Sequence, residues 1–504
     1  MKKFFAAFVF LVFTLPGDAQ NEGNAFFGDA VIHDVYLTFH QSSYWDSLTT
    51  GYTNDVYIKC DVVIDTDTMP DCGIKFKGNS SYNNPSNKKS WKIDFNEYVS
   101  GQKHDGLKKI NLNNCFKDPS FLREKMMLDF LYYRGIYGPR CTYTRVYVNG
   151  VYWGLYTAVE EIDKTFLDLR FNDKKGNLFK GDPSGDLKWL GSSPTAYYTK
   201  YELKTNETQN DWTDLVTFIN KLNNTAIGAL PDTLANYLDM DNFYYTWASH
   251  VLFSNLDSYL GSGHNYYIYH DSTINQFRYI SWDVNEAFGN FNQGMTVAQI
   301  EAMNIFYVPN PPGNRPLHER LLQNNAAKQR LADALCDLVN YDFSIWTLDA
   351  KIDSLANAIR ADVYADSLKF YSNQNFEDNL NNTVTVVGNP GGNDMPGIKS
   401  FLTNRRNSVA SQLGAYGCTV GISDIQNEML DLYPNPAHDQ IRVDGLNENN
   451  CVYEIFDLSG RMILTGNLNN SPVISLHAIA SEGMYILQMY TPSGKIYRNK
   501  FMKQ

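Results

Sequence analysis

The chain has 504 residues, which is enough for two or three domains with a large core. Its formal net charge is −12 at pH 7, and this acidic balance argues against nucleic acid as a main partner. The seven cysteines have no metal-ligand spacing, which argues against a zinc site.

Residues 1–19 have the pattern of a secretory signal peptide. Lys2 and Lys3 supply a positive start, an apolar run extends from Phe4 to Phe13, and a cleavage site follows Ala19. A buried first helix is the alternative interpretation. No later run is apolar enough to cross a bilayer, so we expect an exported chain without a transmembrane segment.

Export would bring the cysteines into an oxidising environment, where some of them can form disulfides. Cys60 and Cys72 are near neighbours in the sequence, and so are Cys115 and Cys141. The odd number of cysteines leaves at least one thiol unpaired. The sequence does not decide which of the possible pairs form.

A lysine-bearing hairpin is predicted after two strands at Ala30–Phe39 and Asp55–Ile64. In Ile74–Lys77 and in Trp91–Phe95, apolar and polar side chains alternate, so each strand has one apolar and one polar face. Paired as a hairpin, the two strands would present their lysines together on the polar face. These lysines are Lys75, Lys77 and Lys92.

The loop between these two strands, Gly78 to Ser90, is dense in Gly, Asn and Ser. It begins with Gly78, Asn79 and Ser80. Small residues with accessible backbone N–H groups suit a nucleotide-binding flap over phosphates. A solvated hairpin with a long polar loop is the alternative interpretation.

A helix is predicted from Phe121 to Gly135, opened by Asp118-Pro119-Ser120 and ended by the glycine. Glu124 lies in its first half. Protein kinases hold the α- and β-phosphates with a strand lysine that pairs with a glutamate of the following helix, and Glu124 could take that role. It could also be a surface charge that the helix dipole favours.

An Asn149-Gly150 turn predicts a hairpin between Thr142–Val148 and Val151–Val159. Three acids follow the hairpin, where a connection between two lobes could lie. They are Glu160, Glu161 and Asp163. The stretch Lys174–Trp189 is predicted to be loop.

The stretch from Asn255 to Gly289 holds two acids, Asp257 and Asp283, around an amide, Asn265. An acid before a hairpin and an acid after it can meet at one end of that hairpin, and two carboxylates with an amide suit Mg²⁺. The order acid, amide, hairpin, acid is also the order of the base and the metal ligands in protein kinases. Each acid could instead form a turn or cap a helix. The predicted strands of the hairpin are Asn265–Tyr269 and Gln276–Ser281.

Amphipathic patterns predict six helices in the second half of the main domain. Gly289 to Pro316 and Asn375–Asp394 are predicted loops. Strands come first and helices later, which indicates an α+β, two-lobed main domain. The predicted helices are Asp211–Leu222, Thr233–Leu238, Asp241–Phe253, Leu317–Val339, Ile345–Tyr364 and Gly397–Leu413.

The pattern changes after Cys418. Residues 418–427 are a predicted linker, and residues 428–504 are a predicted small all-β sandwich, because short strands separated by turns follow one another. The predicted strands are Gln440–Val443, Tyr453–Asp457, Arg461–Thr465, Val473–Leu476, Met484–Tyr490 and Ile496–Met502.

Six separate signatures occur in the main domain: GIKFKGNSS with KKSWKIDF, FLREKMMLDFLYYRGIYGPR, RVYVNGVYWGLYTAVEEID, HNYYIY with ISWDVNEAFG, RPLHERLL, and FLTNRRNSVASQL. Together, and in this order, they resemble the CotH family of spore-coat-type atypical protein kinases. The resemblance runs from about Tyr57 to Leu413, in a domain predicted at residues 20–417. It implies a two-lobed, kinase-like fold that uses ATP and Mg²⁺ or Mn²⁺ to phosphorylate Ser or Thr of a protein substrate or of itself.

The resemblance also implies roles for single residues. Asp257 matches the catalytic-loop acid and Asp283 the metal-binding acid. Asn265 takes the second metal position by order, although it lies farther from Asp257 than in the kinase HRDxxxxN motif. Lys92 is the expected phosphate-binding lysine, with Lys77 as its competitor. The chain has NLD and WDV where protein kinases have HRD and DFG.

The C-terminal part contains YPNP, DLSGR and GMYIL and has a basic end at Lys503. It is similar to the type A sorting domain of the type IX secretion system. The resemblance implies that this machinery takes the chain, through residues 428–504, from the periplasm across the outer membrane. The chain would then be secreted or held at the outer-membrane surface.

ATP is scarce outside cells, so a second hypothesis is a catalytically inactive, kinase-like protein that serves surface adhesion or binding. A third is a polysaccharide-associated role, because 34 Tyr and 8 Trp supply stacking surfaces. Aromatic residues are, however, more often buried in cores.

Overall fold

The computed structural model describes residues 22–28, 32–386, 394–419, 430–446, 451–458, 461–468, 472–491 and 496–504. The predicted signal peptide and most of the predicted linker lie outside these residues. Within the described part of the chain, no helix is long and apolar enough to cross a bilayer.

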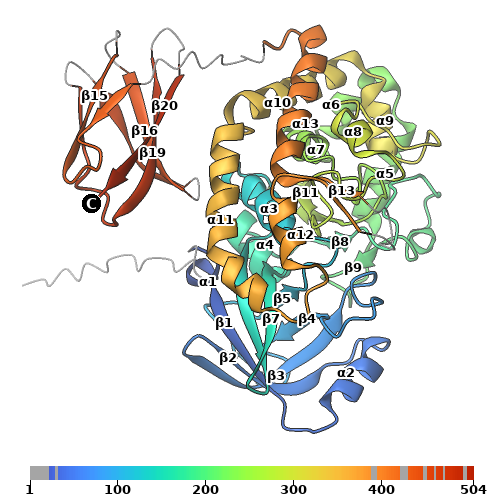
Figure 1. Cartoon of the computed structure of the whole chain (residues 1–504). Coiled ribbons are helices and arrows are strands. Elements are labelled where there is room, and N and C mark those ends of the chain that lie inside the picture. The colour runs from blue at the N-terminus through green and yellow to red at the C-terminus, as the bar shows by residue number, and fades with distance from the viewer. Residues whose placement is uncertain are drawn as a thin grey trace, which may run out of the picture.

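A closed barrel forms the N-terminal part of the described chain (Figure 1). It closes where β1 and β6 pair in parallel. Two short helices, α1 (Asn24–Gly28) and α2 (Tyr44–Tyr52), belong to the same region. Around the barrel, the strands follow the order β1 (His33–Thr38), β2 (Ile58–Ile64), β3 (Asp67–Lys77), β4 (Ser90–Asp94), β5 (Lys109–Asn113), β7 (Val151–Glu160) and β6 (Cys141–Val148).

The predicted lysine hairpin is confirmed as β3 and β4. The apolar pairs Ile74–Ile93 and Phe76–Trp91 are buried in the barrel core. Because successive side chains of a strand point to opposite faces, the lysines lie on the outer face of the barrel. Lys75 pairs with Lys92 in the ladder, and Lys77 follows two residues later.

The Asn149-Gly150 hairpin is confirmed as β6 and β7. Both turn residues have positive φ, +48° and +81°, and Val148 pairs with Val151 across the turn. Positive φ at both central residues is typical of the tight turn that matches the twist of two antiparallel strands.

Helix α3 (Arg123–Tyr133) follows β5 and begins two residues later than predicted. Asp118 organises the segment before it, because its carboxylate accepts hydrogen bonds from the backbone N–H groups of Ser120 (3.0 Å) and Arg123 (2.8 Å). Gly135, with φ +68°, lies just beyond the last turn, as expected for a C-terminal cap.

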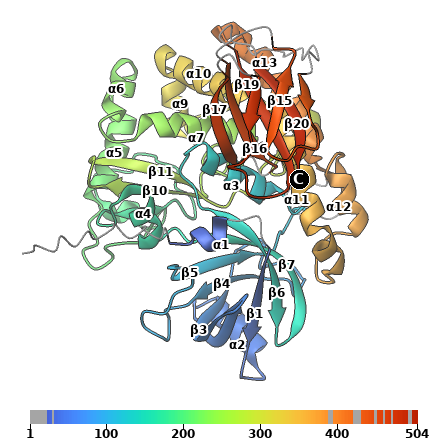
Figure 2. The ribbon, with the colours of Figure 1, turned by 90° about the vertical axis from the view of Figure 1, so that its left-hand side faces the viewer.

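Helices, a two-stranded sheet of β12 (Val384–Thr385) and β13 (Asp394–Met395), and a small four-stranded sheet make up the rest of the main part (Figures 1 and 2). The four-stranded sheet has the order β11 (Gln276–Ser281), β10 (Tyr266–Asp271), β8 (Leu178–Lys180) and β9 (Glu202–Leu203). Its apolar side chains share one large buried cluster with those of the helices, and the barrel has a separate core. The helices are α4 (Lys164–Phe171), α5 (Thr213–Asn224), α6 (Leu230–Leu234), α7 (Met240–Leu252), α8 (Val297–Glu301), α9 (Pro316–Leu322), α10 (Asn325–Tyr341), α11 (Ile345–Ala365), α12 (Asn373–Asn379) and α13 (Ile398–Leu413).

Five predictions in this region were wrong in part. The predicted loop from Gly289 to Pro316 contains α8, and the predicted helix Thr233–Leu238 overlaps α6 only at residues 233 and 234. The predicted loop at 174–189 contains β8, which is short and is held by its pairing with β10. The predicted helix at 317–339 is two helices, because Asn324 lies between α9 and α10 and caps α10 by accepting a hydrogen bond from the backbone N–H of Ala327. The predicted loop at 375–394 contains most of α12.

The disulfide of the structure joins Cys336 of α10 to Cys418, 82 residues further along. The sequence left the pairing open, and the bond that forms does not join either pair of sequence neighbours. Disulfide formation requires Cα atoms within about 7 Å, a condition that the helix packing sets here. The neighbouring cysteines are buried thiols, including the two that lie opposite each other on β2 and β3; they are Cys60, Cys72, Cys115 and Cys141.

The C-terminal part is all-β in its described residues, as predicted. One sheet consists of β14 (Asp431–Tyr433), β15 (Gln440–Asp444) and β18 (Val473–Ser475). The other consists of β17 (Met462–Leu468), β16 (Cys451–Asp457), β19 (Gly483–Tyr490) and β20 (Ile496–Lys503). Side chains from both sheets share one apolar core.

A fully buried ion pair ties the loop of the lysine hairpin to the end of α11. Lys88 pairs with Asp366, and neither side chain has exposed surface. The same carboxylate accepts a hydrogen bond from the backbone N–H of Leu155 at 3.1 Å. Gly154, with φ +137°, makes room for it, because a Cβ atom there would lie 2.5 Å from Asp366 Oδ2. One end of the predicted flap is therefore anchored to the helical part.

Lys88→Met would leave Asp366 buried without its cation. Because breaking a buried pair costs about 3–5 kcal/mol, we expect the free energy of unfolding in urea to fall by that amount. The matched control is Arg330→Met at the exposed Arg330–Asp241 pair, where we expect a loss below about 1 kcal/mol. Equal losses in the two variants would contradict the anchoring role of Lys88.

Candidate active site

The β10–β11 hairpin brings Asn265 and Asp283 to one end. Tyr266 pairs with Ser281 in the ladder, and the backbone N–H of Trp282 donates to the carbonyl of Asn265 at 3.2 Å. Asn265 and Asp283 have left-handed φ values of +59° and +49°. Asn and Asp adopt this conformation more readily than most residues, so both can leave the ladder at this point.

Asp257 joins this end of the hairpin from the segment after α7. Asn265 Nδ2 donates to the backbone carbonyl of Asp257 at 2.8 Å and lies 3.3 Å from its Oδ2. His264 Nε2 lies 2.9 Å from Asp257 Oδ1. The side chains of Asp257 and His264 are 19% and 30% exposed, so the carboxylate remains accessible from solvent. The two predicted acids and the amide thus form one cluster, to which His264 belongs.

Lys77 of β3 and Glu124 of α3 approach the same acids. Lys77 Nζ donates to Asn113 Oδ1 at 2.9 Å, and Asn113 Nδ2 donates to Glu124 Oε1 at 2.7 Å. Lys77 Nζ also lies 5.3 Å from the ring centre of Trp282, the residue before Asp283. The strand lysine and the helix glutamate are therefore linked through the amide of Asn113.

Lys92 lies on the same face of the barrel but pairs with Glu161. Asn111 Nδ2 donates to the other oxygen of that carboxylate at 2.7 Å. Burial acts to raise the pKa of Glu161, but the charge and hydrogen bond of Lys92 lower it to about 2. Of the two candidate lysines, Lys77 is the one that Asn113 links to Glu124 and that lies over the ring of Trp282, next to Asp283.

The first residues of the predicted flap, Gly78, Asn79 and Ser80, are exposed. The hydroxyl of Tyr52 on α2 donates to the carbonyl of Gly78. The carbonyl of Asn79 accepts the backbone N–H of Tyr82 at 3.1 Å, so the loop turns back at once after β3. Phosphate binding by these residues stays a prediction.

A second lysine reaches the acids from the segment before α3. Lys117 Nζ lies 2.8 Å from Glu286 Oε1, and the two side chains are 8% and 7% exposed. Asn290 Nδ2 donates to the backbone carbonyl of Lys117 at 2.9 Å and to Glu286 Oε2 at 3.1 Å. This buried pair holds the segment after β11 against the segment that leads into α3.

Burial raises the pKa of three carboxyl groups in this cluster. It raises the pKa of Glu124 to about 8, with support from the charge of Asp283 and opposition from Lys77. It raises the pKa of Glu286 to about 7, and Asp257 and Asp283 add to the effect. It also raises the pKa of Asp283, against the charge of Lys77. A cation bound among these groups would favour their charged forms.

Within the described residues, no group of three or more His, Cys, Asp or Glu side chains forms a complete metal site. Magnesium is usually held by one or two carboxylates, with water and substrate phosphates as the other ligands. Asp283 can supply the carboxylate. Because Asn265 Nδ2 donates to Asp257, its Oδ1 is the atom that could be a ligand. This oxygen donor set fits Mg²⁺ or Mn²⁺.

Sequence reasoning missed four residues of the cluster. Asn113 could have been found from the sequence, because it alternates with apolar residues along β5 and so belongs to the polar face of that strand. His264 and Glu286 stand inside two of the quoted signatures, HNYYIY and ISWDVNEAFG. Lys117 had no periodic signal, because a loop with φ +58° at this residue brings it to the site.

Two families match the chain. Residues 74–392 match the family described as CotH kinase protein, and residues 431–504 match the secretion system C-terminal sorting domain. The chain belongs to the CotH kinase protein family. The first match spans β3 to α12 and includes every residue of the cluster described above, and the second spans the C-terminal strands. The two resemblances expected from the motifs are confirmed.

Proteins from two organisms are similar to the chain. It is 26% identical over 303 residues to inner spore coat protein H of Bacillus subtilis, which covers 59% of this chain and 79% of that protein. It is 22% identical over 360 residues to invasin CotH3 of Rhizopus delemar, which covers 64% of this chain and 59% of that protein. It is 24% identical over 327 residues to spore coat protein homolog 1 of the same organism, which covers 61% and 52%.

The crystal structure of the Helicobacter pylori proinflammatory kinase CtkA aligns with 61% of this chain and 88% of its own chain. The sequence identity is 8% and the TM-score is 0.23. This likeness is too low to support an argument about the site.

Glu286 makes the free energy of unfolding depend on pH, and its raised pKa sets the sign of this dependence. Its pKa is about 7 in the folded state and about 4.5 when unperturbed. Between these values the folded state keeps a proton that the unfolded chain has lost. The contribution of Glu286 to the free energy of unfolding therefore falls as the pH rises from about 4.5 to about 7, by at most ~1.4 kcal/mol per pH unit.

We expect Glu286→Gln to flatten the dependence of urea-derived stability on pH in this window. Glu202→Gln, at a side chain that is 50% exposed, is the control and should leave the slope as it is. A slope that is the same in Glu286→Gln and in the original protein would contradict the raised pKa.

Proposed function

We propose that the chain is an exported, two-lobed atypical kinase that transfers the γ-phosphate of ATP to Ser or Thr hydroxyls of a protein, either another protein or itself. The barrel would be the N-terminal lobe, and the helices with the β8–β11 sheet would be the C-terminal lobe. One observation carries the proposal. Lys77 of β3 is linked to Glu124 of α3 through the amide of Asn113. Its Nζ lies 5.3 Å from the ring centre of Trp282, the residue before Asp283. At the same end of the hairpin, Asn265 donates to Asp257.

Asp257 would orient the acceptor hydroxyl and take its proton. As the acceptor oxygen bonds to the γ-phosphorus, the bond from that phosphorus to the bridging oxygen breaks and ADP leaves. His264 Nε2 lies 2.9 Å from Oδ1 of Asp257, and Asn265 Nδ2 makes only a longer contact, 3.3 Å, with Oδ2. Oδ2 would therefore be the oxygen that faces the acceptor. Lys77, positioned by Asn113, would neutralise charge on the phosphates.

Asp283 and Oδ1 of Asn265 would hold Mg²⁺ or Mn²⁺. Such an ion supplies charge neutralisation to phosphate oxygens when it is bound. The raised pKa of Asp283 supports this role, because a carboxyl group that burial disfavours as an anion gains most from a nearby cation.

The sorting domain marks the chain for secretion or for the cell surface. We propose that residues 1–19 direct it to the periplasm and that the type IX machinery then takes it across the outer membrane through residues 428–504. Residues 418–427 would link the sorting domain to the kinase domain, residues 20–417.

A surface adhesion or binding protein without catalysis is the second candidate. It is favoured by one observation, the name invasin carried by a similar protein of Rhizopus delemar. A thermal shift in the presence of ATP with Mg²⁺ or Mn²⁺ separates the two. A specific ligand at 100 times its Kd stabilises the native state by about 2.7 kcal/mol, and a protein that does not bind nucleotide would not respond.

Asp283→Ala should abolish transfer of labelled γ-phosphate to the chain itself or to a casein-like acceptor. We expect a loss of at least about 100-fold, because the charge that holds the metal is removed. Circular dichroism should show the fold to be intact. Asp353→Ala, at a side chain that is 58% exposed, is the control with unchanged transfer. Transfer that persists in Asp283→Ala would contradict the metal assignment.

Lys77→Met and Lys92→Met separate the two candidate lysines. We expect Lys77→Met to lower kcat/KM for ATP by about 100-fold and to remove the thermal shift with ATP. Lys92→Met should lose less than about tenfold, because its partner is Glu161. The reverse order of effects would give the phosphate-binding role to Lys92.

A further inference from the structure

One buried histidine of α7 contacts both segments that carry the proposed catalytic acids. His250 Nε2 lies 3.0 Å from the hydroxyl of Ser281, two residues before Asp283. His250 Nδ1 lies 3.2 Å from the side-chain nitrogen of Asn255, two residues before Asp257. The residue is 4% exposed. A single ring therefore bridges the end of β11 and the segment after α7.

The two contacts require a neutral ring with one donor and one acceptor. Asn255 Nδ2 can only donate, so Nδ1 of His250 accepts, and Nε2–H donates to Ser281. Burial lowers the pKa of His250 to about 4, which keeps this form at neutral pH. The backbone adds a third link, because the N–H of Asn255 donates to the carbonyl of His250 at 2.9 Å.

We propose that His250 is a positioning residue, which holds Asp257 and Asp283 at their mutual spacing by its hydrogen bonds to Asn255 and Ser281. This inference rests on the proposed kinase function. The ring does not reach the acids themselves, so its effect on them passes through the two short segments that it joins. A displacement of about 1 Å between reacting groups can cost about 100-fold in rate.

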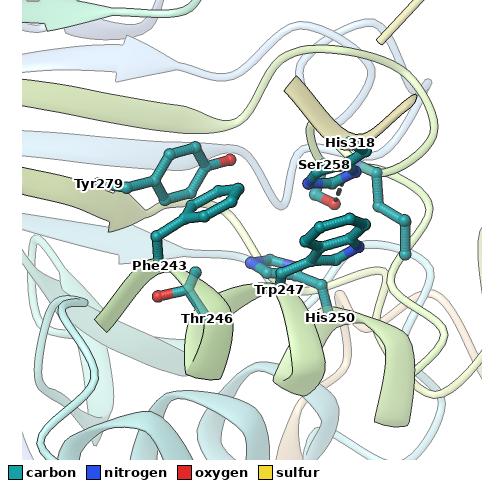
Figure 3. A pocket seen from close by; sticks show the side chains of 8 residues that line it. Phe243, Thr246, Trp247, His250, Ser258, Tyr279 and His318 are labelled. Carbon is teal, nitrogen blue, oxygen red and sulfur yellow. Dashed lines mark hydrogen bonds between the residues drawn. The ribbon is translucent and has the colours of Figure 1, made fainter. Parts of the chain in front are cut away.

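A second histidine, His318, lies near His250 and provides a matched comparison for it. His318 lines the same small cavity as His250, with a volume of about 10 Å³ (Figure 3). Its ring stacks on Trp247 with centroids 4.0 Å apart, and within the described residues its Nδ1 has no hydrogen-bond partner. His318 is 3% exposed, so the two histidines are alike in burial and differ in what they bond.

The test compares steady-state phosphate transfer by the full chain with His250→Phe, His250→Gln and His318→Phe. We expect His250→Phe to lower kcat by about 10–100-fold at saturating ATP and Mn²⁺, with KM for ATP changed less than about threefold. His250→Gln, which can both donate and accept, should recover part of kcat. His318→Phe keeps the stacked ring and should stay within about threefold of the original kcat.

A second pair of variants covers the case in which His250→Phe does not fold. Ser281→Ala removes one of the two hydrogen bonds, and Ser249→Ala removes a buried serine of α7 whose hydroxyl donates to the carbonyl of Tyr245 at 2.8 Å. We expect kcat to fall by about 3–10-fold in Ser281→Ala alone. Ser281→Ala and Ser249→Ala should unfold at similar temperatures.

Four results would decide against the inference. If His250→Phe folds and keeps kcat within threefold, or if Ser281→Ala and Ser249→Ala have equal kcat, His250 does not position the acids. If His318→Phe loses as much kcat as His250→Phe, the effect is one of packing. If the unaltered chain neither transfers phosphate nor shows a thermal shift with ATP and Mn²⁺, the proposed function fails first and the inference fails with it.

Discussion

The kinase-like part of this protein depends on one constraint. Several carboxyl groups lie close together inside it, and few lysines are present to offset their negative charge. Glu124 and Glu286 are buried and Asp283 is half-buried, and the pKa of each of the three is raised. The two lysines that oppose this, Lys77 and Lys117, come from β3 and from the segment before α3. An unpaired buried charge costs several kcal/mol, so the barrel and the helical part have to meet where these charges offset one another. The contacts that pack the two parts together are therefore also the contacts that assemble the site.

The site keeps the order of a protein kinase but not all of its contacts. In protein kinases the β3 lysine pairs with a glutamate of the next helix, and here Asn113 stands between Lys77 and Glu124. The HRD and DFG triplets are absent from the corresponding segments. Instead of such a triplet, hydrogen bonds from His264 and Asn265 hold Asp257 in position. The order of these residues is thus the one expected for a kinase-like site, and the departures from it are the positions at which variants can test that expectation.

Patterns set by neighbouring residues could be predicted from the sequence. The β3–β4 and β6–β7 hairpins follow from side-chain alternation and from a two-residue turn with positive φ, and α3 follows from its apolar face and its terminal glycine. The meeting of Asn265 and Asp283 follows from the geometry of a hairpin alone. By contrast, β8 and α12 have few local signals, because β8 is defined by its pairing with β10 and α12 is a single short helix in a polar stretch.

The amino-acid order alone determined which side chains share a face, which residues bracket a hairpin, and which family the chain resembles. Only the tertiary structure decided that Lys77 rather than Lys92 lies beside Asp283, that Cys336 bonds to Cys418, and that Lys88 is buried against Asp366. The physical reason is the same for all three. Each depends on the distance between segments far apart in the chain, and that distance is set by how the barrel core and the helical core exclude water.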